Sequence, residues 1–338
     1  MKRRHQFKRK FKRKGKNYII KNKIFKYKIN IIIILILIDS FLIFYFIPKI
    51  IDNKIKKYKI INLKQLIENN INFDKIACEY TKELLKNRTK PFDFENELIF
   101  FLSLLSCKIP FSFIRFGDGE NLIMRGNKIG SPVDHWFWKP NNQKFRESLI
   151  ESINICKNEN NFISIPCKNW YAISKSLLSF SSCTSEKYMS FATLFINKNF
   201  PIFKNFISSF IYNKNRWKII LVANSIINKN IKWAYKFYPV PNHIVENWEN
   251  FSSSFFPKIF HEAKKNKLIF FISAGPASNI IISHLSKINK KNIYIDFGSS
   301  IELITKGYST RPYSINTSRF SNQSCEPFIL KNKELIYD

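Results

Sequence analysis

Glycine is scarce in this chain, with 8 residues in 338. The glycine patterns that cradle phosphates, G-x-G-x-x-G and the P-loop, are both absent. The sequence also lacks the nucleophile elbow of esterases and the H-E-x-x-H motif of zinc proteases. Its six cysteines form no C-x-x-C pair and no metal-binding spacing, so they permit one or two disulfides without demanding them. The enzyme classes that depend on these motifs are therefore excluded.

Acidic residues are also few, since 24 Asp and Glu stand against 56 Lys and Arg for a formal net charge of +32. Such a charge is typical of proteins that bind nucleic acid or an anionic membrane. Fourteen of the basic residues, however, lie in residues 1–28, and the others are mostly scattered lysines. A nucleic-acid groove needs clustered basic residues with accessible aromatics. We therefore expect no nucleic-acid partner, and keep a non-catalytic binder of anionic polymer as an alternative.

One long apolar run extends from Ile29 to Ile51, with Asp39 near its middle. Its length is close to the ~20 residues that cross the hydrocarbon core of a bilayer. The preceding tail is far more basic than the following loop, which predicts a cytosolic N-terminus and a type II signal-anchor. A buried core helix is the alternative. We expect a single-pass membrane protein whose C-terminal bulk is luminal or extracytoplasmic.

Composition divides the chain into four parts. Residues 1–28 are a basic cytosolic tail, and residues 29–51 are the transmembrane signal-anchor. Residues 52–92 are polar and basic and are predicted to form a stem that holds the next domain off the membrane. Residues 93–338 are predicted to be the catalytic domain.

Beyond residue 93, apolar runs rich in β-branched and aromatic residues alternate with helical patterns. Continuous apolar runs are typical of strands buried on both faces, and their alternation with helices predicts a parallel sheet. The expected fold class is α/β, with a Rossmann-like, mostly parallel sheet and flanking helices. In such sheets ligands bind beyond the carboxyl ends of the strands. The predicted strands are 111–116, 161–165, 217–223, 267–273 and 292–296, and the predicted helices are 95–107, 143–157, 169–180, 202–212, 225–236, 253–265 and 276–289.

The segment I-R-F-G-D-G-E ends the first predicted strand and carries Arg115, Gly117, Asp118, Gly119 and Glu120. Paired carboxylates suit Mg²⁺ or Mn²⁺, which keep open positions for phosphate oxygens. Glycine lets a ligand approach the backbone, and the planar arginine fork suits a phosphate. The segment therefore favours a nucleotide-sugar enzyme. The alternative is a helix start, with Asp118 as the cap and Glu120 in the first turn.

The segment S-A-G-P-A-S-N places Gly275 and Pro276 between a strand and a helix. Amide groups at a helix N-terminus favour an anion such as a phosphate. Asp296 ends the next predicted strand, where an acid is expected to contact ribose or sugar hydroxyls. This unit resembles half of a dinucleotide or S-adenosylmethionine site, so a methyltransferase is an alternative enzyme. Ordinary turn chemistry between two strands is the alternative without a ligand.

Two further groups of residues are candidates for chemistry. The run D-H-W-F-W at 134–138 offers aromatic rings for stacking on a sugar or base, although clustered Trp and Phe are more often core. Glu302, with Arg311 shortly after it, lies near the expected carboxyl edge of the sheet. We predict Glu302 as the general base for an acceptor hydroxyl, against the alternative of an ordinary surface glutamate.

Taken in order, F-I-R-F-G-D-G-E, F-I-S-A-G-P-A-S-N and Y-I-D-F-G-S-S-I-E resemble segments of the GT-D fold glycosyltransferases. These are bacterial enzymes that extend glycans on serine-rich adhesins, with relatives in polysaccharide clusters. The resemblance spans roughly residues 95–315. It implies that Asp118 and Glu120, as a D-x-E motif, bind the metal of a UDP-sugar, and that Gly275-Pro276 matches the G-P segment of the family. Ser299 stands where the D-I-G-H segment of the family has its histidine.

Together these features predict a membrane-anchored, metal-dependent glycosyltransferase of the hexosyltransferase class. Mn²⁺ or Mg²⁺ on Asp118 and Glu120 is expected to neutralise the diphosphate of a nucleotide sugar. Arg115 and the Gly275 turn are expected to contact phosphate. The acceptor is expected to be a glycan or a glycoprotein.

Overall fold

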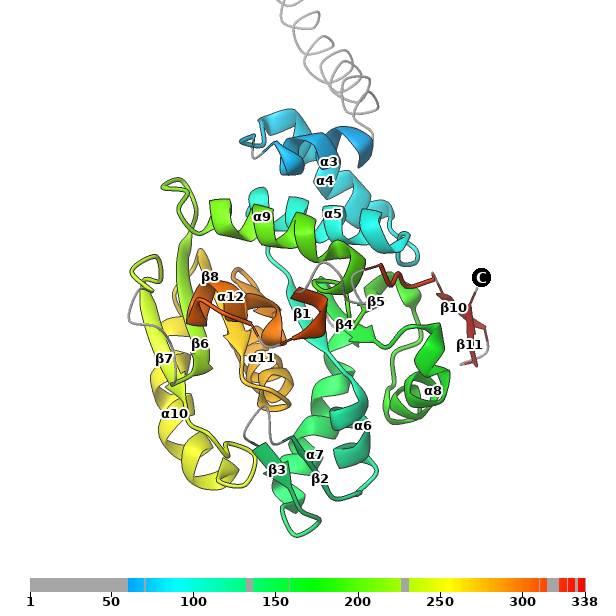
Figure 1. Ribbon diagram of the computed structural model, residues 1–338, viewed down its shortest axis with the longest axis vertical. Coiled ribbons are helices and arrows are strands. Elements are labelled where there is room, and N and C mark those ends of the chain that lie inside the picture. Colours follow the sequence, from blue (N-terminus) through cyan, green and yellow to red (C-terminus); the bar gives the residue numbers. More distant parts are fainter. Residues whose placement is uncertain are drawn as a thin grey trace, which may run out of the picture. The chain divides into compact units, whose positions relative to one another are not determined.

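The computed structural model describes residues 60–69, 71–131, 136–157, 159–225, 231–309, 311–314, 322–326, 328–331 and 334–337 (Figure 1). The predicted tail and signal-anchor lie outside these residues. None of the helices in the described ranges combines the length and the apolar character that a membrane span requires.

Seven strands, all parallel, form the central sheet in the order β5-β4-β1-β9-β8-β6-β7. The α/β class and the parallel sheet are therefore confirmed. Two small antiparallel pairs, β2–β3 and β10–β11, lie outside this sheet. The strands are β1 Ser112–Arg115, β2 Ile129–Ser131, β3 Trp136–Trp138, β4 Asn161–Ile165, β5 Met189–Phe191, β6 Lys218–Asn224, β7 Lys236–Val240, β8 Leu268–Ser273, β9 Ile293–Asp296, β10 Phe328–Lys331 and β11 Glu334–Tyr337.

Helices cover both faces of the sheet, as Figure 1 shows, which is why every residue of β4 and β9 is buried. On one face, Phe101 of α5 packs edge-on against Phe113 of β1 and Phe162 of β4, at ring distances of 4.8 and 4.9 Å. On the other face, α11 contacts β1 and β9. The helices are α3 Ile60–Glu68, α4 Lys75–Asn87, α5 Phe94–Ser106, α6 Asp118–Met124, α7 Gln143–Ser152, α8 Tyr171–Phe180, α9 Phe200–Phe210, α10 Trp248–Ala263, α11 Ala277–Ile288 and α12 Glu302–Lys306.

Part of the segment predicted as a stem belongs to the compact unit. Helices α3 and α4 pack against α5, with Leu63, Ile67 and Ala77 in the hydrophobic core. The compact unit extends from Tyr58 to Asp338, so it begins well before the predicted boundary at 93. These helices carry many polar residues, and each helix has only a short apolar face. The sequence alone therefore did not predict that these faces pack against α5.

Two edge strands and one connection differ from the sequence prediction. β5 and β7 were not predicted, because β5 has three residues and the residues of β7 are mostly half-buried. The helix predicted at 225–236 is wrong in its described part, since residues 231–235 form turns that lead into β7. The other predicted helices and strands are each present to within a few residues.

A buried ion pair holds the β5 edge of the sheet to the helices. Arg88 and Glu97 both have fully buried side chains and form two hydrogen bonds, of 2.6 and 2.7 Å. Arg88 also donates to the carbonyl oxygens of Lys187 and Met189, at 2.8 and 2.6 Å. These additional hydrogen bonds help to offset the cost of burying the two charges. The start of β5 is therefore held in place by this pair.

All six cysteines are paired, rather than one or two pairs only. The disulfides join Cys78 to Cys107, Cys156 to Cys183, and Cys167 to Cys325, with Cα–Cα distances of 5.3, 6.0 and 5.2 Å. These distances suit disulfide geometry. The third bond connects the loop after β4 with the C-terminal segment.

The strand order reverses between β1 and β9. From β1 the chain proceeds outward to β4 and β5, and later returns from the far edge through β8 to β9, which pairs with β1. Loops diverge at such a switch point and leave a crevice at the carboxyl edge of the sheet. The candidate site lies at this edge.

Candidate active site

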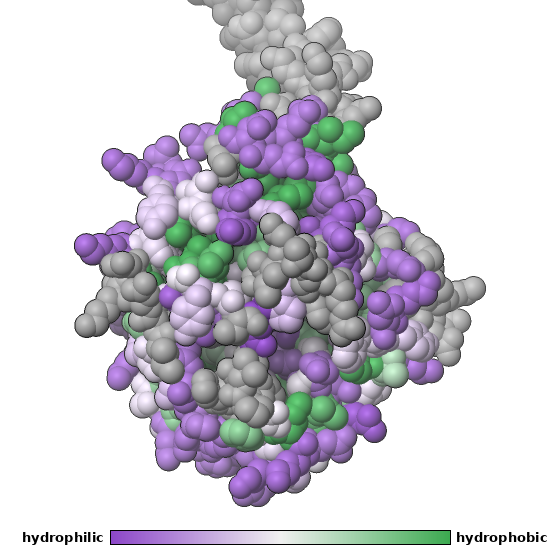
Figure 2. Space-filling view, viewed as in Figure 1, coloured by the Kyte–Doolittle hydropathy of each residue, from purple (hydrophilic) through white to green (hydrophobic). Residues whose placement is uncertain are grey.

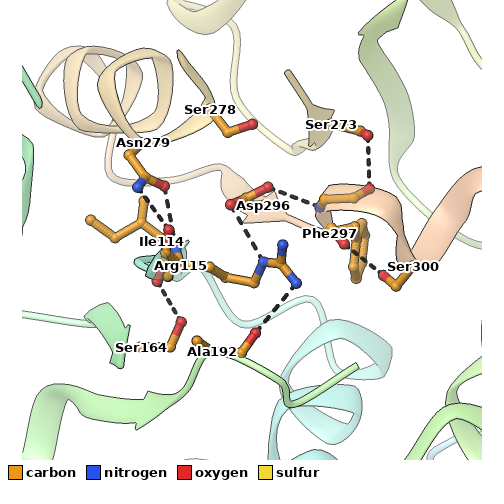
Figure 3. A network of polar contacts seen from close by, with 12 residues as sticks. Ile114, Arg115, Ser164, Ala192, Ser273, Ser278, Asn279, Asp296, Phe297 and Ser300 are labelled. Carbon is orange, nitrogen blue, oxygen red and sulfur yellow. Dashed lines mark hydrogen bonds and ion pairs between the residues drawn. The ribbon is translucent and has the colours of Figure 1, made fainter. Parts of the chain in front are cut away.

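Arg115 is the last residue of β1, and its backbone is held from two sides. The side-chain amide of Asn279, a buried residue of α11, donates to the Arg115 carbonyl at 2.7 Å and accepts from its amide at 3.3 Å (Figure 3). On the neighbouring strand, the Ser164 hydroxyl donates to the Ile114 carbonyl at 2.7 Å. The end of β1 therefore has a fixed place relative to both β4 and α11.

The guanidinium of Arg115 is held by three further segments. Its Nε contacts Oδ2 of Asp296 at 3.5 Å, and Nη1 donates to the Ala192 carbonyl at 3.3 Å (Figure 3). The second oxygen of Asp296 accepts from the Gly298 amide at 2.9 Å. Gly298 has φ of +50°, and a Cβ there would approach Cζ of Arg115 to 2.8 Å. Only glycine allows both this backbone conformation and the contact with the guanidinium.

Burial controls the charge state of two carboxyl groups beside Arg115. It raises the pKa of Glu120 to about 7; the Asp296 carboxylate adds to this, whereas hydrogen bonds from backbone amides and the charge of Arg115 oppose it. Burial likewise raises the pKa of Asp296 against the opposing charge of Arg115. The two carboxyl groups and one guanidinium therefore form a coupled group beneath the cavity.

The D-x-E segment occupies the first turn of α6. Gly117 is the N-cap, and its amide donates to Oε2 of Glu120 at 2.8 Å. The expected alternative of a helix start is therefore present, with Gly117 instead of Asp118 at the cap. Residues two apart on a helix do not face each other, so Asp118 is exposed whereas Glu120 turns back toward Arg115. Among the described residues, no group of three or more His, Cys, Asp or Glu is placed to hold a metal ion.

The Gly-Pro turn joins β8 to α11, as its sequence predicts. Gly275 has φ of +57°, and the Ser278 hydroxyl accepts from the Ala274 amide at 2.9 Å, which closes the turn. Ser273 donates to the Gly298 carbonyl at 2.7 Å and so ties this turn to the loop after β9. The N-terminus of α11 thus lies at the carboxyl edge of the sheet.

Glu302, predicted as a free general base, is engaged by two cations. Its carboxylate pairs with Nζ of Lys306 at 2.9 Å and lies 4.0 Å from Nε of Arg311. Ser309 also donates to it, at 3.4 Å. These contacts indicate a role for Glu302 in holding Lys306 and Arg311.

These segments enclose a single cavity of about 540 Å³, a volume within the range of small-molecule sites. Hydrophilic side chains cover most of the face seen in Figure 2. Asp296 does not line the cavity and instead contacts Arg115, so the predicted contact with ribose is replaced by a role in positioning. The predicted residues that do line it are Arg115, Gly117, Asp118, Gly119, Glu120, Gly275, Pro276 and Glu302.

The aromatic run at 134–138 is only partly described, and its described side chains are not at this cavity. Trp138 is 1% exposed and belongs to the core, and Phe137 stacks on His243 with a ring distance of 5.9 Å. Asp134 and His135 lie outside the described residues. For Trp138 the core alternative is therefore the right one.

Sequence reasoning missed several residues that line the cavity, among them Lys306, Trp170 and Asn224. Two of them carried a usable signal. Trp170 closely follows the strand predicted at 161–165, and ligands of parallel sheets bind beyond the carboxyl ends of the strands. Lys306 is four residues after Glu302, a spacing that pairs opposite charges on a helix.

Comparisons with known proteins give a distant likeness in structure. No family model and no curated protein matches the sequence. Two solved structures are similar, one described as the highly conserved domain of unknown function 1792 with a distinct glycosyltransferase fold, the other as its selenomethionine-substituted form. Each match covers 73% of this chain and 92% of the solved chain at 15% identity, with TM-scores of 0.42 and 0.43. The fold described for that domain is of the kind that the sequence resemblance implies.

Gly298→Ala is expected to destabilise the protein through two separable effects. The positive φ and the contact with Arg115 should together lower the free energy of unfolding by more than ~1 kcal/mol. Gly126→Ala is a matched control, because Gly126 has φ of +80° but a Cβ there would lie 3.9 Å from its nearest neighbour, Nε of Arg146. Denaturant unfolding of both variants measures the difference.

The contact itself is isolated by adding Arg115→Ala. In that background Gly298→Ala should lose most of its excess effect over Gly126→Ala, giving a coupling energy of about 1 kcal/mol or more. Additive effects of Gly298→Ala and Arg115→Ala would show that the guanidinium does not rest on Gly298.

Proposed function

We propose that this protein is a metal-dependent glycosyltransferase that transfers a sugar from a UDP-sugar to a glycan or glycoprotein. One observation carries the proposal. Of the three segments that resemble GT-D glycosyltransferases, the first lies about 150 residues before the other two in sequence, yet all three contribute residues to one cavity. The first supplies Asp118 and Glu120, the second supplies Gly275 and Pro276, and the third supplies Asp296, which holds Arg115.

The diphosphate of the donor would lie among the cations of the cavity. Arg115, Lys306 and Arg311 all line it, and their side chains are 20%, 26% and 24% exposed. Partial burial strengthens their attraction for an anion relative to bulk water. The N-terminus of α11 at Gly275 adds amide groups of the same electrostatic sign. In this arrangement Glu302 and Asp296 hold the cations in place while the leaving group develops charge.

Asp118 and Glu120 are the residues that would hold Mn²⁺ or Mg²⁺. Both carboxylates line the cavity, and oxygen ligands suit these hard cations. Because the two side chains diverge on α6, the metal would need phosphate oxygens of the donor to complete its coordination. When bound, the metal supplies positive charge that stabilises the departing diphosphate.

The alternative of an S-adenosylmethionine enzyme is less well supported. An S-adenosylmethionine site would need Asp296, the acid at the end of β9, to contact ribose hydroxyls. Asp296 is 4% exposed and its oxygens are bound to Arg115 and the Gly298 amide. Its carboxylate is therefore engaged within the protein.

Release of UDP from a panel of UDP-sugars, with and without Mn²⁺, tests the proposal. The wild-type protein should release UDP only with a divalent cation. Asp118→Asn and Glu120→Gln should lower kcat by about 100-fold or more, as expected for lost stabilisation of leaving-group charge. Glu249→Gln is the control, since Glu249 is an exposed acid in the first turn of α10 and does not line the cavity.

Two results would count against the proposal. Release of UDP that survives both Asp118→Asn and Glu120→Gln would remove the metal assignment. Absence of UDP release from every UDP-sugar, together with binding of S-adenosylmethionine without metal, would replace the glycosyltransferase by the alternative enzyme.

We further propose that residues 29–51 anchor the protein in a membrane with the catalytic domain on the luminal or extracytoplasmic side. The three disulfides support this, because disulfides persist in oxidising compartments and are rare in the cytosol.

Alkylation of the cysteine thiols in the full-length protein tests whether the catalytic domain lies in an oxidising compartment. Protein taken from its native cells and denatured without reductant should show no alkylated cysteine by mass spectrometry, and all six should react after reduction. Six reactive thiols before reduction would place the catalytic domain in the cytosol.

A further inference from the structure

Trp170 is 54% exposed although it lines the cavity. It ends η3 (Lys168–Trp170), a short 3-10 helix that follows β4 at the carboxyl edge of the sheet. A single exposed aromatic is ordinary on a protein surface, so the surroundings of Trp170 decide what it does.

The wall around Trp170 is built from three separate segments, 167–170, 192–197 and 323–326, that are tied together. Cys167 is bonded to Cys325, and the Thr193 hydroxyl lies 3.1 and 3.0 Å from their sulfur atoms. The Lys198 amide donates to the Gln323 carbonyl at 3.1 Å. These contacts hold the C-terminal segment beside Trp170, so the surface is preorganised.

This wall is uncharged where it faces the cavity. The polar residues that its described segments contribute to the lining are Asn169, Thr193, Asn197, Gln323 and Ser324, all with amide or hydroxyl groups. Lys168 does not line the cavity, and its ammonium pairs with Glu326 at 2.6 Å. Amides and hydroxyls beside an exposed indole suit a neutral ligand with many hydroxyl groups and an apolar ring face.

The opposite end of the cavity has a different character. There Val240 and Ile244, which are 2% and 4% exposed, lie with Asn224, whose amide bonds Asn242 at 2.7 Å. A mostly apolar pocket with an amide at its edge suits a nucleobase. Of the cations described above, Arg115 reaches the first residue of the Trp170 wall, where it donates to the Ala192 carbonyl at 3.3 Å, whereas Lys306 and Arg311 come from the α12 region.

Resting on the proposed function, we propose that Trp170 is the stacking platform of an acceptor subsite for an uncharged sugar ring. The pyranose face of the acceptor lies on the indole, and its hydroxyl groups bond the amides of Asn169, Asn197 and Gln323. The donor nucleoside lies at the β6–β7 end, so Trp170 sets the affinity for acceptor without contacting the donor.

The test measures the affinity for acceptor and the affinity for donor separately. Trp170→Ala should raise KM for acceptor by about tenfold, the effect expected for loss of one aromatic stack, and Trp170→Phe should retain part of the affinity. KM for the UDP-sugar should change much less than KM for acceptor in both variants. The probes are p-nitrophenyl hexosides as neutral acceptors and p-nitrophenyl uronides as charged ones, with the wild type preferring the hexosides.

Tyr171→Ala is the matched control, because Tyr171 is the next residue and 39% exposed but does not line the cavity. It should leave KM for acceptor unchanged. A loss of affinity for UDP in Trp170→Ala would place the nucleobase on the indole and overturn the inference, as would unchanged KM for acceptor or a wild type that accepts no hexoside. Wild-type protein without UDP release would instead defeat the proposed function itself.

Discussion

The guanidinium of Arg115 is the point on which the arrangement of the site depends. It lies where β1 meets β9 and contacts a buried carboxylate from β9, a carbonyl after β5 and the glycine at 298. Its own backbone is bonded to α11 through Asn279. One residue therefore joins β1, β9, α11 and the segment after β5 at the switch point of the sheet. Three segments that line the cavity, those around Ala192, Gly298 and the start of α11, are therefore fixed relative to one another.

The charges at the site are arranged differently from those on the rest of this cationic chain. Most of its lysines are dispersed, whereas Arg115, Lys306 and Arg311 line one cavity and are each partnered by an acid. The acids limit the mobility of the cations without removing their positive field. A diphosphate entering this cavity meets cations that are already oriented, so little reorganisation is required when its charge increases.

The sequence predicted those parts of the fold and the site that depend on neighbours in the chain. Continuous apolar runs such as β4 and β8 identify buried parallel strands, and the residues just after β1 and β8 do line the cavity. The roles of side chains that contact residues far away in the sequence could not be predicted from the sequence. The role of Asp296 depends on Arg115, 181 residues away, and the pairing of Glu302 with Arg311 depends on how the loop after α12 folds back. Helices α3 and α4 look polar until α5 covers their narrow apolar faces.

A crystal structure of the protein with UDP and Mn²⁺ tests the central claim most directly, because the claim is that three distant segments form one nucleotide-sugar site. The account predicts a diphosphate beside Arg115 and the Gly275–Pro276 turn, and an ion against Asp118 or Glu120. It also predicts the base at the β6–β7 end of the cavity. UDP bound away from this cavity, or bound within it with no contact to Arg115 or the turn at Gly275, would contradict the account.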